Sequence, residues 1–193
     1  METQSIYLTG VGGQGIGMIS EILLRAVDHA DLRVKSVDTH GLAQRGGIVV
    51  SQLRIGETVH TPIIPEGEAD LVIALERHEA LRGMNYALRD RGTLVYYNTV
   101  WQPLETRLNR AGEVSEGLIE ETCASRNIRL IRVLQPELSD PRMQNIVVLA
   151  EIARQSLISN VTIEHYQQAM DDLMRGDMLE SNLKLFYDRQ EQD

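Results

Sequence analysis

The sequence predicts a single α/β domain in which helices cover both faces of a largely parallel, Rossmann-like sheet. Apolar runs of strand length alternate along the chain with segments of helical periodicity, as in successive βαβ units. The length of 193 residues suits one well-buried domain and is short for two. A glycine-rich turn also joins the first strand to the first helix. We therefore expect one domain over residues 1–193, in which residues 162–193 form a helical tail.

The first part of the chain supplies a strand, a helix and a series of short strands. In the helix, Ile16, Ile19 and Leu23 repeat on one face. After the second strand, the glycine-rich segment Thr39–Gly47 leads straight into a β-rich run without an intervening helix. The predicted elements are the strand Ser5–Thr9, the helix Gln14–His29, and the strands Leu32–Val37, Ile48–Ile55 and Val59–Ile64, the last of them closed by Pro62 and Pro65.

The rest of the chain alternates more regularly between strands and helices. Its clearest signal is "SDPRMQNIVVLAEIARQ", in which Asp140 can cap free backbone N–H groups and Pro141 suits the first helical position. Besides the helix that starts there, the pattern predicts strands at Leu71–Leu75, Thr93–Tyr97 and Ile128–Val133, and helices at Arg77–Arg89, at Ser115–Arg126, from Thr162 onward and at Glu180–Asp188.

The helical tail carries apolar side chains at helical spacing. Leu179, Leu183 and Phe186 form one stripe, which is typical of a face packed on the core. The tail is also rich in methionine, whose adaptable side chain suits a groove on a partner protein. Both interpretations stand at this point: a core face and a docking element.

Composition excludes several classes of function. A single cysteine, Cys123, cannot by itself hold an iron–sulfur cluster or a cysteine zinc site, and the histidines have no metal-ligand spacing, so we expect no metal site in this chain. The net charge of −9 argues against non-specific nucleic-acid binding. The N-terminal "METQSIYLTG" lacks the features of a signal peptide, and no apolar run is long enough to cross a membrane, so we expect a cytoplasmic protein without a membrane partner.

The segment "LTGVGGQGIGMIS" has the spacing and context of a phosphate-binding loop. Glycines let the backbone approach a phosphate closely, and free N–H groups at a helix start point at the anion. The alternative interpretation is a tight turn that only lets helix and sheet pack closely. Asp38, at the end of the second strand, stands where an acidic residue holds a ribose hydroxyl in dinucleotide-binding folds. The residues that we expect to contact a cofactor here are Gly10, Gly12, Gly13, Gln14 and Gly15.

The segment "HGLAQRGGIVVSQLRIG" forms a second candidate binding loop. Arg45 offers a planar fork that suits phosphate or carboxylate, and Gly46 and Gly47 let the backbone pass close to a ligand. His40 can hydrogen-bond a substrate or hold the loop in shape, which makes it the candidate catalytic residue. Glu76 and His78 also follow a strand end, where they line the same cleft or, as we favour, charge the first turn of a helix. Asn145 either faces this rim from a helix start or is a polar surface residue.

Three stretches together resemble a known family: "GVGGQGIGMISEILLRA", "HGLAQRGGIVVSQLRIG" and "PIIPEGEADLVIALERHEAL". They resemble the gamma-type domain of the 2-oxoacid:acceptor oxidoreductases (the pyruvate/ketoisovalerate oxidoreductase family), and the likeness is greatest to its indolepyruvate-type members. It runs from Ile6 to the C-terminal "NLKLFYD". The most specific block consists of His40, Gly41, Gln44, Arg45, Gly46 and Gly47, and the resemblance adds Gln44 to the expected binding residues.

The resemblance implies one subunit of an enzyme that oxidatively decarboxylates aryl 2-oxoacids to acyl-coenzyme A and passes the electrons to ferredoxin. It implies that thiamine diphosphate and iron–sulfur clusters belong to a larger, alpha-type partner, through which ferredoxin is reached, and that this chain is inactive alone. The expected anion for the two loops is the diphosphate of coenzyme A, or that of thiamine diphosphate held across the subunit boundary. From the residues alone, two alternatives stay open: an independent enzyme that uses NAD(P) or S-adenosylmethionine, and a regulatory nucleotide-binding module.

Overall fold

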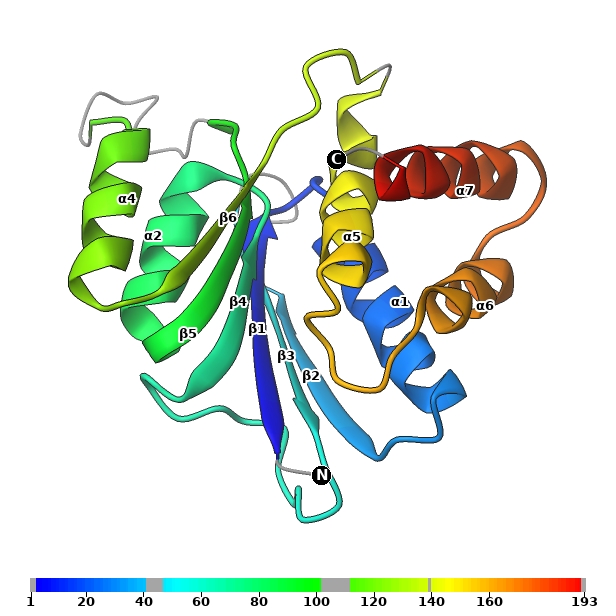
Figure 1. Ribbon diagram of the computed structural model, residues 1–193, viewed down its shortest axis with the longest axis horizontal. Helices are drawn as coiled ribbons and strands as arrows, with labels where there is room; N and C mark the ends of the chain where they lie inside the picture. The colour runs from blue at the N-terminus through cyan, green and yellow to red at the C-terminus, as the bar shows by residue number, and fades with distance from the viewer. Residues whose placement is uncertain (1–2, 41–46, 102–111, 139, 192–193) are drawn as a thin grey trace.

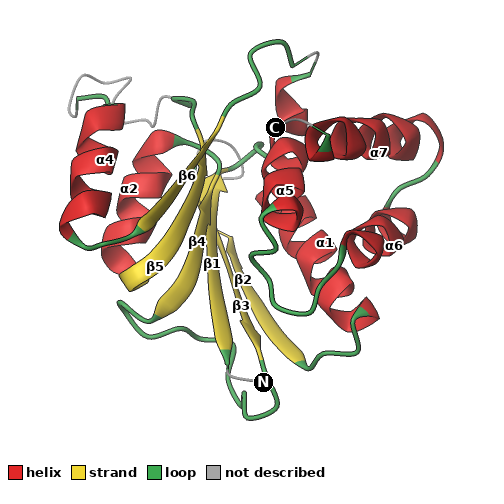
Figure 2. Cartoon of the chain, viewed as in Figure 1, coloured by secondary structure: helices red, strands yellow, loops and turns green. Residues whose placement is uncertain are grey.

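The computed structural model describes residues 3–40, 47–101, 112–138 and 140–191, and within them six strands form one sheet between two layers of helices (Figures 1 and 2). The strand order is β2-β3-β1-β4-β5-β6. The strands span Gln4–Val11 (β1), Val34–His40 (β2), Ile48–Ile55 (β3), Ala69–Ala74 (β4), Leu88–Tyr97 (β5) and Arg129–Val133 (β6).

The sheet is largely parallel, as predicted, with an antiparallel insertion. β1, β4, β5 and β6 run parallel to one another. β3 lies between β1 and β2 and runs antiparallel to both, with Ile55 opposite Gln4 and Val34. This arrangement follows from the connection at residues 41–47, which is too short to hold a crossover helix and therefore sends the chain back beside β2.

The prediction of a strand at Val59–Ile64 is wrong. In the structure this segment is irregular and leads from β3 toward β4. Pro62 and Pro65 have no N–H group to donate to a neighbouring strand. The N–H of Ile64 instead donates to Oε1 of the Gln52 side chain at 2.7 Å. The Gln52 side chain of β3 thus holds the segment around Ile64, for which the sequence pattern predicted backbone pairing with a neighbouring strand.

The helices form two layers, one on each face of the sheet (Figure 1). On one face lie α2 (Arg77–Tyr86) and α4 (Glu116–Ser125), and on the other α1 (Ile16–His29), α5 (Gln144–Arg154), α6 (Ile163–Leu173) and α7 (Gly176–Gln190). A short 3-10 turn, η1 (Pro141–Met143), precedes α5. The predicted cap at Asp140 is confirmed, since its Oδ1 accepts from the N–H of Arg142 at 2.9 Å.

Each face of the sheet buries its own apolar cluster, as expected for parallel strands covered on both sides. In β1 and β4, Leu8 and Ile73 pack into the cluster under α1 and α5. Val72 and Ala74 of β4 alternate with them and pack into the cluster under α2 and α4. The strands are therefore almost continuously buried, and only loops at the ends of the sheet are free to build a site.

The C-terminal helices complete the first of these clusters. Phe186 of α7 and Tyr166 of α6 are fully buried, with ring centroids 6.1 Å apart. Leu179 and Leu183 pack against the same cluster. Leu179, Leu183 and Phe186, which the sequence also allowed as a docking element, therefore belong to the core face of α7. The last helix also begins earlier than expected, at Gly176.

Candidate functional site

The candidate site lies where two neighbouring parallel strands send the chain to opposite faces of the sheet. β1 continues into α1 on one face, and β4 continues into α2 on the other (Figure 1). Such a switch point opens a crevice outside the carboxyl ends of the two strands, which is where open α/β sheets bind ligands. The predicted glycine loop follows β1 at this crevice, and Glu76 follows β4.

The glycine loop needs glycine for two different reasons. At Gly10 a Cβ atom would lie 2.8 Å from the Ile16 side chain, so this position is closed by packing. At Gly15 a Cβ atom would lie 2.5 Å from Nδ2 of Asn145, and the backbone φ of +85° also favours glycine. At Gly13 nothing lies within 4 Å of the added atom, and the reason is the backbone, with φ at +103°. Gly13 is exposed and leaves open space beside the start of α1.

Gln14 lies underneath the loop. Its side chain is buried, Oε1 accepts from the N–H of Val11 at 2.8 Å, and Nε2 donates to the carbonyl of Leu75 at 2.9 Å. The carboxamide thereby ties the end of β1 to the end of β4 across the switch point. Both ends of this carboxamide are engaged, and the backbone N–H of Gln14 donates to the carbonyl of Val11 at 3.1 Å, so Gln14 shapes the loop.

A backbone hydrogen bond joins the glycine loop after β1 to the end of the second predicted loop, at Gly47. The N–H of Gly12 donates to the carbonyl of Gly47 at 2.8 Å. His40 ends β2 and pairs in register with Val49. The side chain of His40 and the predicted residues Gln44, Arg45 and Gly46 lie outside what the structure describes.

Asp38 also lies near the start of α1. It is exposed, and its Oδ1 accepts from Oγ of Ser20 at 3.3 Å. Its position at the end of β2 is the one expected for an acidic residue that contacts a ribose.

Two buried acidic side chains follow the end of β4. Glu76 caps α2 by accepting from the N–H of Glu79, and its Oε2 lies 3.1 Å from Nδ1 of His78. Glu79 accepts from Oγ1 of Thr9, on β1, at 2.6 Å and pairs with Arg82 at 3.0 Å. Burial raises the pKa of Glu79 above its usual value. Sequence reasoning treated Glu76 as a helix-start charge and missed Glu79, because its partner Thr9 lies 70 residues away.

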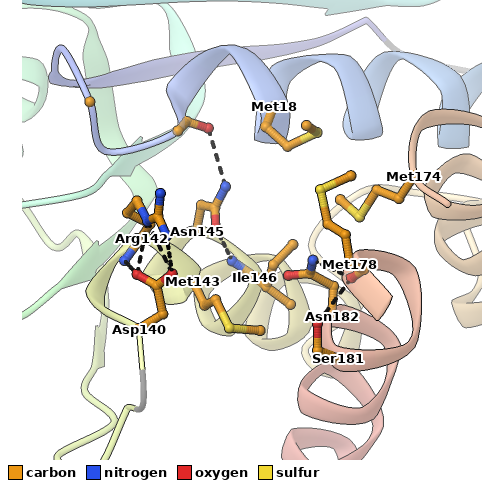
Figure 3. Close-up of a pocket in the computed structure, with 12 residues that line it drawn as sticks. Met18, Asp140, Arg142, Met143, Asn145, Ile146, Met174, Met178, Ser181 and Asn182 are labelled. Atoms are coloured by element: carbon orange, nitrogen blue, oxygen red, sulfur yellow. Dashed lines mark hydrogen bonds and ion pairs between the residues drawn. The ribbon is translucent and has the colours of Figure 1, made fainter. Parts of the chain in front are cut away.

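A cavity of about 390 Å³ opens beside the start of α1 (Figure 3). The glycine loop and α1 form one wall, the turn η1 and the start of α5 a second, and the end of α6 with the start of α7 a third. The lining residues are Gly13, Gly15, Met18, Asp140, Arg142, Met143, Asn145, Ile146, Met174, Met178, Ser181 and Asn182.

Of these lining residues, sequence reasoning singled out the loop glycines and Asn145. The Asn145 side chain is buried, and its Nδ2 donates to the carbonyl of Gly15 at 3.4 Å, while Oδ1 accepts from the N–H of Ile146 at 2.9 Å. The methionines of this cavity were missed, because they come from segments up to 160 positions apart (178 − 18) and no spacing rule joins them.

In the described part of the chain, no group of three or more His, Cys, Asp or Glu side chains is arranged to hold a metal ion. No described helix has the length and apolar character needed to span a membrane.

The fold and the site define a single-domain α/β protein of the doubly wound class, with a glycine-rich loop at its switch point. The chain belongs to the pyruvate ferredoxin/flavodoxin oxidoreductase family, whose sequence pattern matches residues 5–188. This confirms the family that the loop motifs indicated.

Two relatives among characterised proteins share substantial identity with the chain. The indolepyruvate oxidoreductase subunit IorB of Archaeoglobus fulgidus is 35% identical over 196 aligned residues, which cover 93% of this chain and 90% of that protein. The subunit of the same name from Methanothermobacter thermautotrophicus is 52% identical over 80 residues, 42% of this chain and 40% of that one.

Solved structures share the fold at low identity. The keto/oxoacid ferredoxin oxidoreductase gamma subunit of Geobacter sulfurreducens has a TM-score of 0.65 at 18% identity, with 97% of this chain and 95% of that chain covered. The 2-oxoglutarate:ferredoxin oxidoreductase of Magnetococcus marinus, solved with 2-oxoglutarate, coenzyme A and succinyl-CoA bound, has a TM-score of 0.69 at 18% identity. There the match covers 98% of this chain but only 31% of the larger one.

Proposed function

We propose that this chain is a subunit of a 2-oxoacid:ferredoxin oxidoreductase of indolepyruvate type, which oxidatively decarboxylates aryl 2-oxoacids to acyl-coenzyme A. The observation that carries the proposal is the 35% identity, over nearly the whole of both chains, to a protein named as an indolepyruvate oxidoreductase subunit. The alternatives of an NAD(P)- or S-adenosylmethionine-dependent enzyme, or of a regulatory nucleotide-binding module, are left as outcomes of the tests below.

The electron-carrying groups belong on a larger, alpha-type partner in this proposal. The one cysteine of the sequence, Cys123, is buried beside the Sδ atom of Met84, and burial raises the pKa of its thiol to about 11. A single thiol that resists ionisation does not fit an iron–sulfur cluster, which needs several thiolates. We therefore assign the clusters and thiamine diphosphate to the partner, and expect ferredoxin to be reached through it.

In this proposal, the glycine loop of this chain holds the phosphates of coenzyme A. Helix α1 begins at Gly15 without a side-chain cap, so the backbone N–H groups of its first turn are available to an anion. The space beside Gly13 lets such an anion approach the backbone. Coenzyme A supplies the thiol that accepts the acyl group, and the loop orients its far end.

The loop is tested by paired glycine substitutions in the chain reconstituted with its partner. Gly13→Ala places a side chain in strained backbone and in the open space, and we expect the KM for coenzyme A to rise about tenfold, the equivalent of roughly one lost hydrogen bond to a charged group. Gly117→Ala, on the exposed first turn of α4 and away from the loop, has nothing within 4 Å and serves as the control. Equal KM values for the two variants would remove the loop from the coenzyme A site, and tight binding of NAD(P) or S-adenosylmethionine to the isolated chain would favour an alternative function.

Arg45 is tested separately, on the strength of the sequence and of the bond that anchors Gly47, two residues on, to Gly12. We propose that Arg45 clamps a phosphate or carboxylate with its planar fork. Arg45→Lys then fails to restore function, because lysine offers a point charge. Both Arg45→Ala and Arg45→Lys raise the KM for coenzyme A or for the 2-oxoacid by about ten- to a hundredfold, and the Tm of the free subunit stays unchanged. Normal titrations with both substrates would contradict the assignment.

A further inference from the structure

The antiparallel half of the sheet, β2 and β3, extends beyond one of the two helix layers. On one side, α1 packs on β1, β2 and β3. On the other side, α2 packs on β1, β4 and β5, and α4 packs on β6 (Figure 1). Among the described residues, the irregular segment after β3 reaches this second side of β3, where the N–H of Ile64 bonds the Gln52 side chain. We call this side of the β2–β3 pair the open face.

The register of the strands decides which side chains stand on the open face. Leu53 and Ile55 of β3 belong to the cluster under α1, whereas Val50 packs against the cluster on the other side of the sheet. Side chains alternate along a strand, and residues directly opposite each other in an antiparallel pair share a face. The residues of the open face are therefore Lys35, Val37 and Thr39 of β2 and Ile48, Val50, Gln52 and Arg54 of β3.

One end of the open face carries two cations without an acidic partner. Lys35 and Arg54 are directly opposite each other, an arrangement in which like charges destabilise a sheet. Nη1 of Arg54 donates to the carbonyls of Thr61 and Ile63 at 3.4 Å, and its buried Nε has no hydrogen-bond partner. Neither cation pairs with a carboxylate in the described part of the chain, whereas Arg89, for example, pairs with an aspartate at 2.8 Å.

A lysine on an edge strand has an ordinary explanation, which Arg54 does not share. β2 is an edge strand, and lysine in such a strand commonly prevents pairing with other chains. Arg54 belongs to β3, which lies between β1 and β2 and has no free edge. A half-buried cation without a counter-charge is costly, and here it occurs in a chain whose net charge is −9. The pair of cations therefore indicates an acidic occupant.

The remainder of the open face and its borders are apolar. Ile48, at the other end of β3, is 43% exposed, and Ile63, in the segment that follows β3, is 53% exposed. Tyr86, at the end of α2, is also exposed, and its ring lies 6.0 Å from that of Tyr7 on β1, which is opposite Gln52. Exposed apolar side chains that gather on one surface mark protein interfaces, in which tyrosine and arginine are enriched.

We propose that the open face is the docking surface for the larger partner subunit, which presents carboxylates to Lys35 and Arg54 and apolar side chains to Ile48. The inference rests on the proposed function, because that function requires such a partner. Ile48 follows Gly47, whose carbonyl accepts from the N–H of Gly12, so a partner seated on the open face also borders the glycine loop. A nucleic acid is a poorer fit, since the net charge of the chain repels phosphate.

A charge reversal at Lys35 tests the electrostatic half of the proposal. The Kd between the full chain and the purified partner is measured by calorimetry, and Lys35→Glu is expected to raise it about tenfold or more, because it places a carboxylate against carboxylates. The variant should fold at least as well as the wild type, since it gives Arg54 an opposite charge across the strands. Lys184→Glu, at the other lysine of the sequence, changes the net charge equally and should bind normally. Loss of affinity in both variants, or in neither, would overturn the assignment.

A buried charge at the apolar border tests the other half. Ile63→Asp is expected to raise the same Kd about tenfold or more, because the interface would have to desolvate the new carboxylate. Leu118→Asp, at an apolar position of similar exposure (44%) on α4, is the matched control and should leave the Kd unchanged. Both side chains are exposed in the free chain, so both variants should fold. Equal Kd values for the two variants would contradict the assignment.

Zero-length crosslinking of the wild-type complex locates the contact directly. A carbodiimide joins a lysine amine to a neighbouring carboxylate, and the sequence has two lysines, Lys35 and Lys184. We expect mass spectrometry to find Lys35 joined to an aspartate or glutamate of the partner. Crosslinks to the partner through Lys184 alone would place the interface on α7 and overturn the proposal.

Other occupants of the open face are separate outcomes that would also overturn it. A free chain that sediments as a dimer, which Ile63→Asp but not Leu118→Asp dissociates, would give the face to a second copy. Binding to phosphatidylserine vesicles that Lys35→Glu abolishes would give it to a membrane. Aryl 2-oxoacid-dependent ferredoxin reduction at saturating partner tests the proposed function separately. An active complex with the same Kd for all variants would overturn this inference alone, whereas the absence of both complex and activity would overturn the proposed function as well.

Discussion

Gln14 illustrates how a single residue can be misread when only its motif is known. Its place inside a glycine loop suggested a ligand contact, whereas the structure assigns its carboxamide to Val11 and Leu75, at the ends of β1 and β4. A buried carboxamide that satisfies one donor and one acceptor is well suited to fix a loop, because each of its partners would otherwise be unpaired away from water.

We predict that Gln14→Leu lowers the free energy of unfolding by about 1–3 kcal/mol, because it leaves the N–H of Val11 and the carbonyl of Leu75 buried and unpaired. Gln168→Leu, on the exposed face of α6, is the control and should change stability by less than about 0.5 kcal/mol. Urea unfolding of the free chain measures both. An unchanged midpoint for Gln14→Leu would mean that the bridge across the switch point contributes nothing.

At the scale of elements, buried acidic and aromatic side chains fix how helices sit on the sheet. Glu79 of α2 reaches Thr9 of β1 at 2.6 Å, and Phe186 of α7 reaches the cluster beneath α5 and α6. The Glu79–Thr9 contact involves a buried carboxyl that can ionise, so its contribution to the free energy of unfolding depends on pH. The second is apolar, so its contribution depends on packing alone.

The stability contributed by Glu79 should fall as pH rises. Burial raises the folded-state pKa of this carboxyl, while its Thr9 and Arg82 contacts oppose the shift, so the native state binds the proton more tightly than the unfolded state. The resulting stabilisation is complete below the unfolded pKa and is lost as pH rises through the folded pKa. The free energy of unfolding of Glu79→Gln, measured in urea, should therefore rise relative to that of the wild type between pH 4.5 and pH 7.5. Glu121→Gln, exposed on α4, is the control, and a pH-independent difference for Glu79→Gln would contradict the prediction.

Truncating Phe186 should expose the role of α7 in the core. Phe186 is fully buried and packs at 6.1 Å from the Tyr166 ring, so we expect Phe186→Ala to lower the free energy of unfolding by about 3–5 kcal/mol. Its neighbour Tyr187 is 38% exposed, and Tyr187→Ala should have a much smaller effect. Thermal unfolding of the free chain distinguishes them. A Phe186→Ala chain of normal stability that fails to assemble with its partner would restore the docking interpretation of the tail.

At the scale of the whole molecule, local patterns were predictable and long-range contacts were not. β3 was predicted at its observed bounds, Ile48–Ile55, and Ser115, Asp140 and Thr162 were predicted at their helix starts, because strand periodicity and capping depend on neighbouring residues. The missed features join distant segments. The antiparallel insertion of β3 and the cavity built from α1, α5 and α7 depend on which strands and helices become neighbours in the fold.

The whole chain should be colourless and without oxidoreductase activity when purified alone. Its single cysteine, Cys123, is buried and cannot supply the thiolates of a cluster. Anaerobic purification followed by a visible spectrum and a ferredoxin-reduction assay measures this. Activity should appear only after the addition of an alpha-type partner. Stoichiometric iron and acid-labile sulfide in the isolated chain would contradict the assignment of the clusters to that partner.

The central place of β1 has a consequence for biosynthesis. Its neighbours in the sheet are β3 and β4, and both are translated after it, so neither edge of β1 can pair until the chain has reached Ile48, and both only at about Ala74. At roughly 5–20 residues per second, the nascent chain carries this strand unpaired for several seconds. Ile6 and Leu8, which are fully buried in the finished protein, have no core to pack into during that interval. The growing chain therefore carries an apolar strand with two open edges, which is the kind of segment that pairs wrongly with other chains.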